Sequence, residues 1–214
     1  LKFINIAAAT KSVTINSKAT SFATVNGIFV EDSIWRRVND LDLEIDGTGE
    51  AFLGGLDSHK LSSLKVSNLQ KLVLESFALP KLDIVDVQSV IINGINNAES
   101  DIIINSPLAT CTILGEVYAN SINMNCAQVY IDANAQIKSD ITINVQQVVL
   151  SDNSIWRSLE GGISINTEEA DIAGLLSIEN PSKELKVFKN GAEVTKTAAN
   201  RYTESSPKEP SGFS

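Results

Sequence analysis

A unit of about 20 residues recurs through most of this chain and limits its fold more than any other feature. The clearest copy is Asp101-Ile-Ile-Ile-Asn105, in which we expect Ile102 and Ile104 to point inward. The central hydrophobic residue of the unit recurs at positions 15, 45, 66, 84, 104, 124, 143, 165 and 187. After a first step of 30 residues, every step is 18 to 22 residues. Such near-constant spacing is typical of a solenoid.

A second set of alternating hydrophobic residues follows the first by 7 to 9 residues in each repeat. It consists of Ala51/Leu53, Leu72/Leu74, Val90/Ile92, Cys111/Ile113, Val129/Ile131, Val148/Leu150 and Ala170/Ile172. Alternation with period two indicates strands with one buried side. The sequence therefore predicts an all-β, single-stranded β-solenoid (β-helix) of about 7–9 coils with a period near 20 residues. A third, less regular face is expected to contain Leu79, Val117, Ile137 and Ile178.

Residues 1–196 are predicted to form one solenoid domain. The long first step places an insertion at 26–40, which we expect to cap the first coil. It contains Trp35, whose surroundings, Asp32-Ser-Ile-Trp35-Arg36, return 121 residues later as Asn153-Ser-Ile-Trp156-Arg157. We interpret Trp35 as a packing residue, with an exposed recognition aromatic as the alternative. At the other end, 183–196 reads as a terminal β-hairpin around Asn190-Gly191, followed by a polar tail at 197–214.

Composition and charge exclude several classes of protein. Hydrophobic residues make up 43% of the chain but aromatic residues only 6%, which suits small side chains stacked in a narrow interior. The net charge of −9 argues against nucleic-acid binding, which requires a basic surface. No stretch approaches the about 20 consecutive apolar residues of a transmembrane helix.

Asparagine and aspartate recur at the corner that follows the first strand of each coil. The members of this corner ladder are Asn16, Asp46, Asn105, Asn125, Asn144 and Asn166, with Ser67 and Val85 at the equivalent places in two coils. Asn and Asp suit tight bends because they tolerate left-handed backbone angles and form local hydrogen bonds. Stacked about 4.8 Å apart, their side chains can also form a ladder of amide hydrogen bonds. We interpret them as structural.

The outward positions of the second face form a nearly apolar row. We call this row the outward stripe; coil by coil it consists of Phe52, Val73, Ile91, Thr112, Tyr130 and Val149. Asp171 ends it. Contiguous apolar surface commonly marks a contact with a partner. Two alternatives stay open. Neighbouring β-branched and aromatic side chains stabilise each other across strands, so the row can be purely structural. The chain's own C-terminal tail can also cover it. The stripe is the candidate interaction surface.

The sequence predicts no catalytic, cofactor-binding or metal-binding residue. His59 is the only histidine, and its neighbours Asp57 and Ser58 are too close in sequence to adopt triad geometry with it. Two acidic groups, Asp40/Asp42/Glu44/Asp46 and Glu168/Glu169/Asp171, lack the glycine-rich calcium repeat and read as solvated strand surface.

Cys111 and Cys126 are the only cysteines, too few for a disulfide framework and wrongly spaced for a zinc site. The repeat stacks Cys111 against Val129, so we expect two free, buried thiols whose sulfurs lie out of bonding reach of each other.

Leu43-Glu-Ile-Asp-Gly-Thr-Gly-Glu-Ala-Phe-Leu-Gly-Gly-Leu56, followed by short strand-turn units and a hairpin, resembles the head GIN domain family of autotransporter adhesins. The segment Val129-Tyr-Ile-Asp-Ala-Asn-Ala-Gln-Ile-Lys-Ser-Asp-Ile-Thr142 is similar to bactofilins, which polymerise end to end. The first resemblance implies a stacked β-coil protein with an adhesive role. We therefore expect a non-enzymatic secreted or surface adhesin or binding module whose partner is a protein or glycan. Its expected location is extracellular, at the cell surface or in the periplasm. The alternatives are a structural subunit that self-assembles with copies of itself, as a homo-oligomer or filament, and a carbohydrate-active β-helix enzyme.

Overall fold

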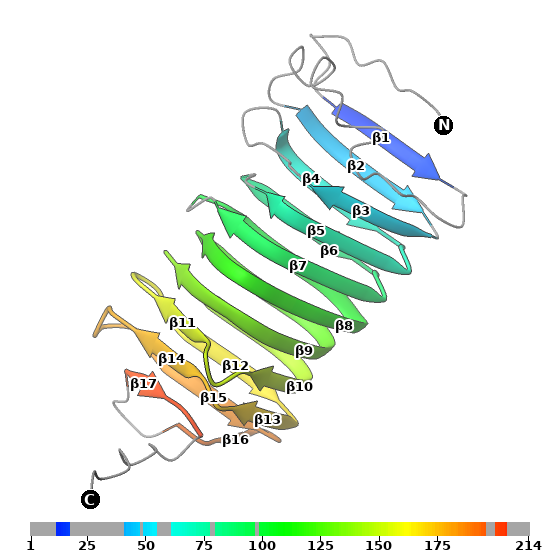
Figure 1. Cartoon of the computed structure of the whole chain (residues 1–214). Helices are drawn as coiled ribbons and strands as arrows, with labels where there is room; N and C mark the ends of the chain where they lie inside the picture. The colour runs from blue at the N-terminus through cyan, green and yellow to red at the C-terminus, as the bar shows by residue number, and fades with distance from the viewer. Residues whose placement is uncertain are drawn as a thin grey trace, which may run out of the picture.

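The structure, a computed structural model, describes residues 12–17, 41–47, 49–54, 61–77, 80–96, 99–195 and 200–204. All regular secondary structure in these ranges is strand, and the strands stack one above another along a single axis (Figure 1). Almost all neighbouring strands are parallel. The described part is therefore a β-solenoid, as the repeat predicts. It has about six turns, so the expected 7–9 coils are not confirmed. The insertion at 26–40, with Trp35, and His59 lie outside the described residues.

The first face is a continuous parallel ladder. It contains β1 (Ser12–Ser17), β2 (Leu41–Gly47), β4 (Leu61–Ser67), β6 (Lys81–Val85), the starts of β8 (Asp101–Ala119), β9 (Ser121–Ile137) and β10 (Ile141–Leu150), then β12 (Ile163–Thr167) and β15 (Leu185–Lys189). Every central hydrophobic position of the repeat is paired in register with the next, from Ile15 with Ile45 to Ile165 with Val187. The period read from the sequence is therefore the stacking period.

The second face is equally regular. It contains β3 (Glu50–Gly54), β5 (Lys71–Phe77), β7 (Ser89–Asn96), the later parts of β8, β9 and β10, and β13 (Glu169–Ile172). Leu53, Leu74, Ile92, Ile113, Ile131, Leu150 and Ile172 form one column of paired positions. All seven side chains are buried. This column, too, is the one that the alternation predicts.

The third face is less regular than the other two, as expected. It contains the ends of β5, β7, β8 and β9, then β11 (Ile155–Ser158), β14 (Leu175–Ile178) and β17 (Arg201–Tyr202). Val117, Ile137 and Ile178 all lie on it, as predicted, in the ends of β8 and β9 and in β14. Val117 pairs with Ala135 and Ile137 with Ala119, so these two residues occupy neighbouring columns. The corner before this face varies in length, with a register shift between Asn93 and Ile95. Leu79 lies outside the described residues.

Trp156 occupies the interior of the third face and is fully buried. It pairs with Ala135 on one side and Leu176 on the other. Its indole N–H donates a hydrogen bond of 3.1 Å to the carbonyl of Ala133. Two small residues, Ala133 and Ala135, thus leave room in one coil for the large ring in the next.

The predicted corner ladder is present in pairs. The Asn125 amide donates to the Asn105 oxygen at 3.0 Å, and the Asn166 amide donates to the Asn144 oxygen at 2.9 Å. Asp46 accepts instead from Asn68 at 2.6 Å and from Ser67 at 3.0 Å. These hydrogen bonds lower the pKa of the Asp46 carboxyl. The side chain of Asn16 lies outside the described part of the chain.

Both cysteine thiols are free and buried, as predicted. The two thiols are not joined by a disulfide. Cys111 pairs with Val129, as the repeat predicts, and Cys126 is buried in the same coil as Val129. The neighbouring Cys126 thiol and burial both raise the pKa of the Cys111 thiol, which therefore stays protonated.

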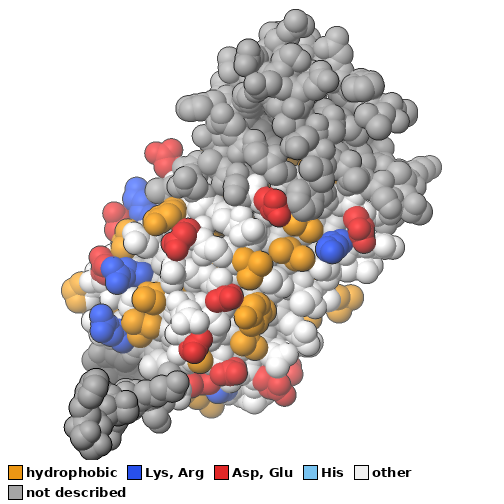
Figure 2. Space-filling model, viewed as in Figure 1, with side chains coloured by type: hydrophobic (Ala, Val, Ile, Leu, Met, Phe, Trp, Pro, Cys, Tyr) orange, Lys and Arg blue, Asp and Glu red, His pale blue; other side chains and the backbone are white. Residues whose placement is uncertain are grey.

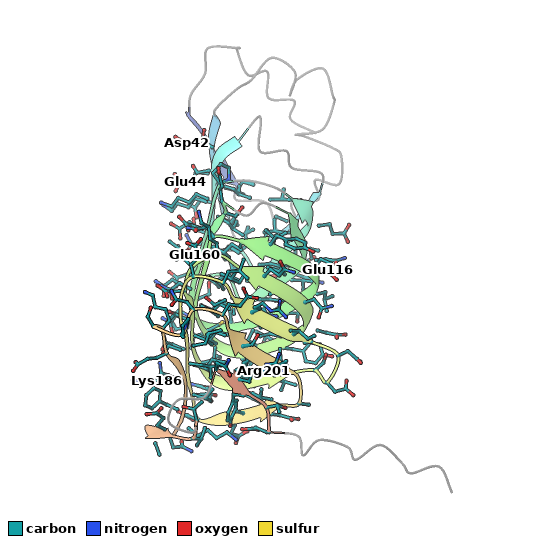
Figure 3. The ribbon with its side chains drawn as sticks, turned by 90° about the vertical axis from the view of Figure 1, so that its left-hand side faces the viewer. Asp42, Glu44, Glu116, Glu160, Lys186 and Arg201 are labelled. Atoms are coloured by element: carbon teal, nitrogen blue, oxygen red, sulfur yellow. The ribbon has the colours of Figure 1, made fainter. Side chains whose placement is uncertain are left out.

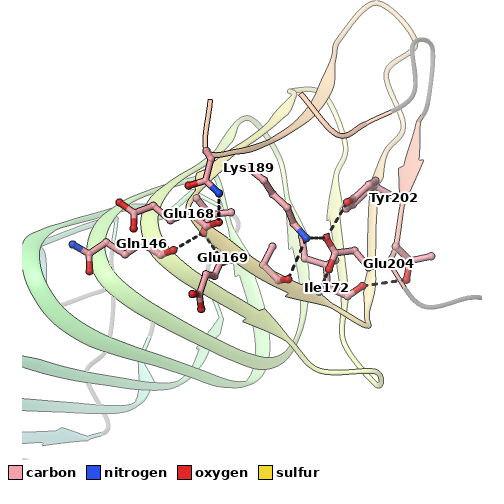
Figure 4. A network of polar contacts seen from close by, with 11 residues as sticks. Gln146, Glu168, Glu169, Ile172, Lys189, Tyr202 and Glu204 are labelled. Carbon is pink, nitrogen blue, oxygen red and sulfur yellow. Dashed lines mark hydrogen bonds and ion pairs between the residues drawn. The ribbon is translucent and has the colours of Figure 1, made fainter. Parts of the chain in front are cut away.

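Two short antiparallel pairs end the solenoid. β15 turns at Asn190-Gly191, both with positive φ, into β16 (Ala192–Glu193), which is the hairpin read from the sequence. The sequence assigned 197–214 to a polar tail, yet within it β17 pairs antiparallel with β14. Next to β17, the Glu204 carboxylate is bound by Lys189, by the Tyr202 hydroxyl at 3.1 Å and by the backbone N–H of Ile172 at 3.3 Å (Figure 4).

We expect this end of the molecule to respond to alkaline pH through Tyr202. Burial and the hydrogen bond to Glu204 raise the pKa of the Tyr202 phenol from 10.0 to about 12. The raised pKa means that the protonated phenol stabilises the folded state. This contribution to the free energy of unfolding is complete below pH 10.0, the ordinary pKa, and is lost as the pH rises to about 12. In urea denaturation, the wild type should therefore lose more stability than Tyr202→Phe as the pH rises from 10.0 to about 12. Equal losses in both proteins would contradict this.

Candidate functional site

The structure places the outward stripe in a single ladder on the second face. Phe52 pairs with Val73, Val73 with Ile91, Ile91 with Thr112, Thr112 with Tyr130, and Tyr130 with Val149. No register shift interrupts these five pairings. With about 4.8 Å between neighbouring strands, they extend about 24 Å along the axis of the solenoid. The predicted stripe thus exists as a row of adjacent positions.

The stripe reaches the surface of the described coils. Tyr130 is its most accessible described member, with 41% of its surface exposed. Val73, Ile91, Thr112 and Val149 are half-buried. β7, β8 and β9 cross the front of the molecule, where hydrophobic side chains reach the surface between isolated acidic ones (Figures 1 and 2). The side chain of Phe52 lies outside the described part.

Mostly polar side chains border the stripe on both sides. Two residues before the positions from Val73 to Val149 lie Lys71, Ser89, Thr110, Gln128 and Gln147. Two residues after them lie Glu75, Asn93, Leu114, Asp132 and Ser151, of which only Leu114 is apolar. The Asp132 carboxylate accepts a hydrogen bond of 2.7 Å from Ser151 in the next coil. An apolar centre between polar borders is the usual composition of a protein contact surface.

A projecting leucine beside the stripe was missed by sequence reasoning. Leu108 has 90% of its surface exposed, more than any other described hydrophobic residue. It lies in a corner between Ser106 and Thr110. These two residues pair with Cys126 and Gln128 of the next coil, so the corner that contains Leu108 is longer than its equivalent in that coil. A cavity of about 440 Å³ lies beside it, lined by Asp86, Val87, Gln88, Ser106, Pro107 and Leu108. The extra residues, together with Pro107, are the sequence signal of this corner.

A second cavity of about 270 Å³ lies on the third face, lined by Glu116, Asn134, Ala135, Gln136, Ile155 and Arg157. Three of its polar side chains are engaged within the protein, and the Asn134 amide donates to the Glu116 carboxylate at 3.4 Å. The Asn134 oxygen accepts a hydrogen bond of 3.1 Å from the N–H of Ile155, and Arg157 forms an ion pair of 3.1 Å with Glu179. A third hollow, of about 430 Å³, lies on the first face near its C-terminal end and includes Asp140, Glu184 and Lys186. Neither was predicted from the sequence.

The acidic residues of the first face contact the next coil instead of converging. Asp42 accepts a hydrogen bond of 2.5 Å from Ser63, and Glu44 forms an ion pair of 2.8 Å with Lys65. Figure 3 shows Asp42 and Glu44 along one side of the solenoid and Glu116 on the opposite side. Asp40 lies outside the described residues. Within the described ranges, no group of three or more His, Cys, Asp or Glu side chains is arranged to hold a metal ion.

Comparison with family models, curated proteins and solved structures gave no match to this chain. Evidence for its function therefore comes from its own surface. In the part of the chain that the structure describes, no helix is long and apolar enough to cross a membrane.

Proposed function

We propose that this protein is a non-enzymatic binding module of the adhesin type, which acts outside the cell or at its surface. The observation that supports the proposal is the unbroken ladder of the outward stripe, with Tyr130 41% exposed near its C-terminal end. Contiguous apolar surface on a protein commonly marks a contact. Tyrosine is among the residues enriched at the energetic centres of such contacts.

The shape of the stripe favours an extended partner. It is a straight row about 24 Å long, from five steps of about 4.8 Å, on one face of a rigid ladder. A rigid, preformed surface loses little conformational entropy on binding. A flat protein surface or a glycan chain that lies along the axis would match this shape, and the resemblance to head GIN domain adhesins agrees with either partner.

Self-assembly into a filament is the alternative function. Exposed strand edges at the ends of a solenoid are templates for further pairing. At the C-terminal end, however, β14 and β15 each already pair with an antiparallel strand, β17 and β16. The paired strands at the described C-terminal end thus favour the binding module over a subunit to which further copies add at both ends.

Tyr130→Ala tests the proposal. We expect it to weaken binding to a glycan or protein target by roughly tenfold, because truncating an aromatic residue that anchors a contact typically costs more than about 1 kcal/mol. The target is selected first with the wild type on a glycan array and on immobilised extracellular-matrix proteins. The affinities of both proteins for it are then measured by biolayer interferometry.

Asn123→Ala is the matched control, since Asn123 lies in the same strand, β9, and is exposed on the first face. It should bind like the wild type. Leu108→Ala tests whether the contact extends to the neighbouring corner. Unchanged binding of Tyr130→Ala to a target that the wild type binds would eliminate the stripe as the recognition surface.

A further inference from the structure

The last strand of every face is covered by a segment that turns back onto it. In a parallel solenoid each coil leaves one row of backbone N–H and C=O groups for the next coil, so the final coil has an open edge. Here that edge consists of β15, β13 and β14 on the three faces (Figure 1). How each edge is filled decides whether another coil can follow.

Antiparallel strands fill two of the three edges. On the first face, Phe188 and Lys189 of β15 pair with Glu193 and Ala192 of β16. On the third face, Leu176 and Ser177 of β14 pair with Tyr202 and Arg201 of β17, and the N–H of Ile178 donates to the carbonyl of Asn200 at 2.9 Å. Both added strands have only two residues. Strands this short offer little edge of their own to a further partner.

The edge of β13, on the second face, is filled by side chains and by the backbone N–H of Glu204 instead of by a strand. The carbonyl of Ala170 accepts from the Lys189 ammonium at 3.3 Å. The N–H of Ile172 donates to the Glu204 carboxylate at 3.3 Å, and the carbonyl of Ile172 accepts from the N–H of Glu204 at 2.8 Å. The Thr203 hydroxyl donates to the same carbonyl at 3.3 Å. These groups replace those that a further strand would supply.

Glu204 joins the elements at this end. Its carboxylate contacts β13 through Ile172, β15 through Lys189 and β17 through Tyr202. The side chains of Lys189 and Glu204 are 31% and 23% exposed, so their ion pair is partly shielded from water. Shielding strengthens an ion pair relative to one at the open surface. Figure 4 shows the Lys189 and Glu204 side chains meeting between β15 and β17.

We propose that residues 200–204, the C-terminal strap, close this end of the solenoid and prevent a second copy of the chain from stacking on it. The occupant that the strap excludes is another solenoid, because the edge beneath it consists of parallel strands whose partners elsewhere in the molecule are coils of the same chain. This inference does not depend on the outward stripe. Glu204 is a positioning residue that holds the strap in place.

Two variants of the full chain test the proposal: deletion of residues 200–214, and Glu204→Ala. We expect the deletion variant to associate at a concentration roughly tenfold below that of any wild-type association, and Glu204→Ala to shift in the same direction by less. Sedimentation velocity over a concentration series measures this. Negative-stain electron microscopy should show the associated particles lengthened along the solenoid axis.

Lys186→Ala is the control, because Lys186 lies in the same strand as Lys189 but pairs with Glu184 at 2.6 Å, away from the strap. It should sediment like the wild type. A folded deletion variant that sediments like the wild type would overturn the proposal. If the deletion variant fails to fold, a folded Glu204→Ala that sediments like the wild type overturns it instead.

The Tyr130→Ala substitution, added to the deletion variant, separates the strap from the stripe. Association that persists in this double variant supports stacking at the end of the solenoid. Association that is lost there, or particles that pair side by side, would assign the contact to the stripe and contradict the role of the strap.

Discussion

Trp156→Ala should destabilise the protein by about 3–5 kcal/mol, the usual cost of truncating a buried aromatic residue to alanine. Trp156 is fully buried, and its neighbours Ala133 and Ala135 are too small to fill the resulting cavity. The carbonyl of Ala133 would also lose its hydrogen bond from the indole. Because native domains are stable by only about 5–15 kcal/mol, much of the protein should be unfolded at moderate denaturant. Urea unfolding followed by circular dichroism measures the effect.

Two further substitutions give this result its controls. Trp156→Phe keeps most of the apolar volume and removes the hydrogen bond, so it should cost less than the alanine variant. Arg157→Ala changes the adjacent residue, whose ion pair with Glu179 is 40% and 51% exposed and should contribute less than about 1 kcal/mol. If Trp156→Ala unfolded at the same urea concentration as Arg157→Ala, the packing argument for the third face would be wrong.

Gly161→Ala should destabilise by about 1–3 kcal/mol, because overpacking a well-packed interior has this cost. A Cβ at Gly161 would lie 2.2 Å from the carbonyl carbon of Ser139 and 2.6 Å from the nitrogen of Asp140. These are backbone atoms of the preceding coil, which no side-chain rotation can move. The coils would have to separate locally, and the same urea measurement detects the loss.

Gly191→Asn is the contrasting variant. Gly191 has a φ of +77°, and a Cβ added there would meet nothing within 4 Å, so space is open and only backbone conformation matters. Asparagine adopts positive φ more readily than other residues, and its cost should be small. A Gly161→Ala variant as stable as Gly191→Asn would show that the stack is looser at this corner than its distances indicate.

The two regular faces could be predicted because one class of residue, the hydrophobic residues, recurs in them at a near-constant spacing. Alternating hydrophobic residues repeat every 18 to 22 positions, and each one pairs with its equivalent in the next coil. A strand shifted by one residue would turn its hydrophobic side outward, so the pattern has only one acceptable register. The same constraint placed the outward stripe correctly.

The third face and the ends could not be predicted in this way. The third face mixes Ala135, Trp156 and Leu176 in one inward column, so its members share no residue type or size. Its register depends on a corner near Asn93 whose length varies. β17 contains only two residues, Arg201 and Tyr202, and neither alternation nor apolarity marks it.

The constant register of the two inward columns also limits how a chain of this kind can change length. An insertion of one residue within a strand reverses the direction of every side chain that follows it, whereas an insertion of one whole coil preserves both columns. Each coil adds about 4.8 Å, and its contacts are confined to its immediate neighbours. The length of the molecule therefore changes in steps of one coil. Duplication of one repeat would lengthen the outward stripe by one residue position and leave the Glu204 contacts at the C-terminal end unchanged.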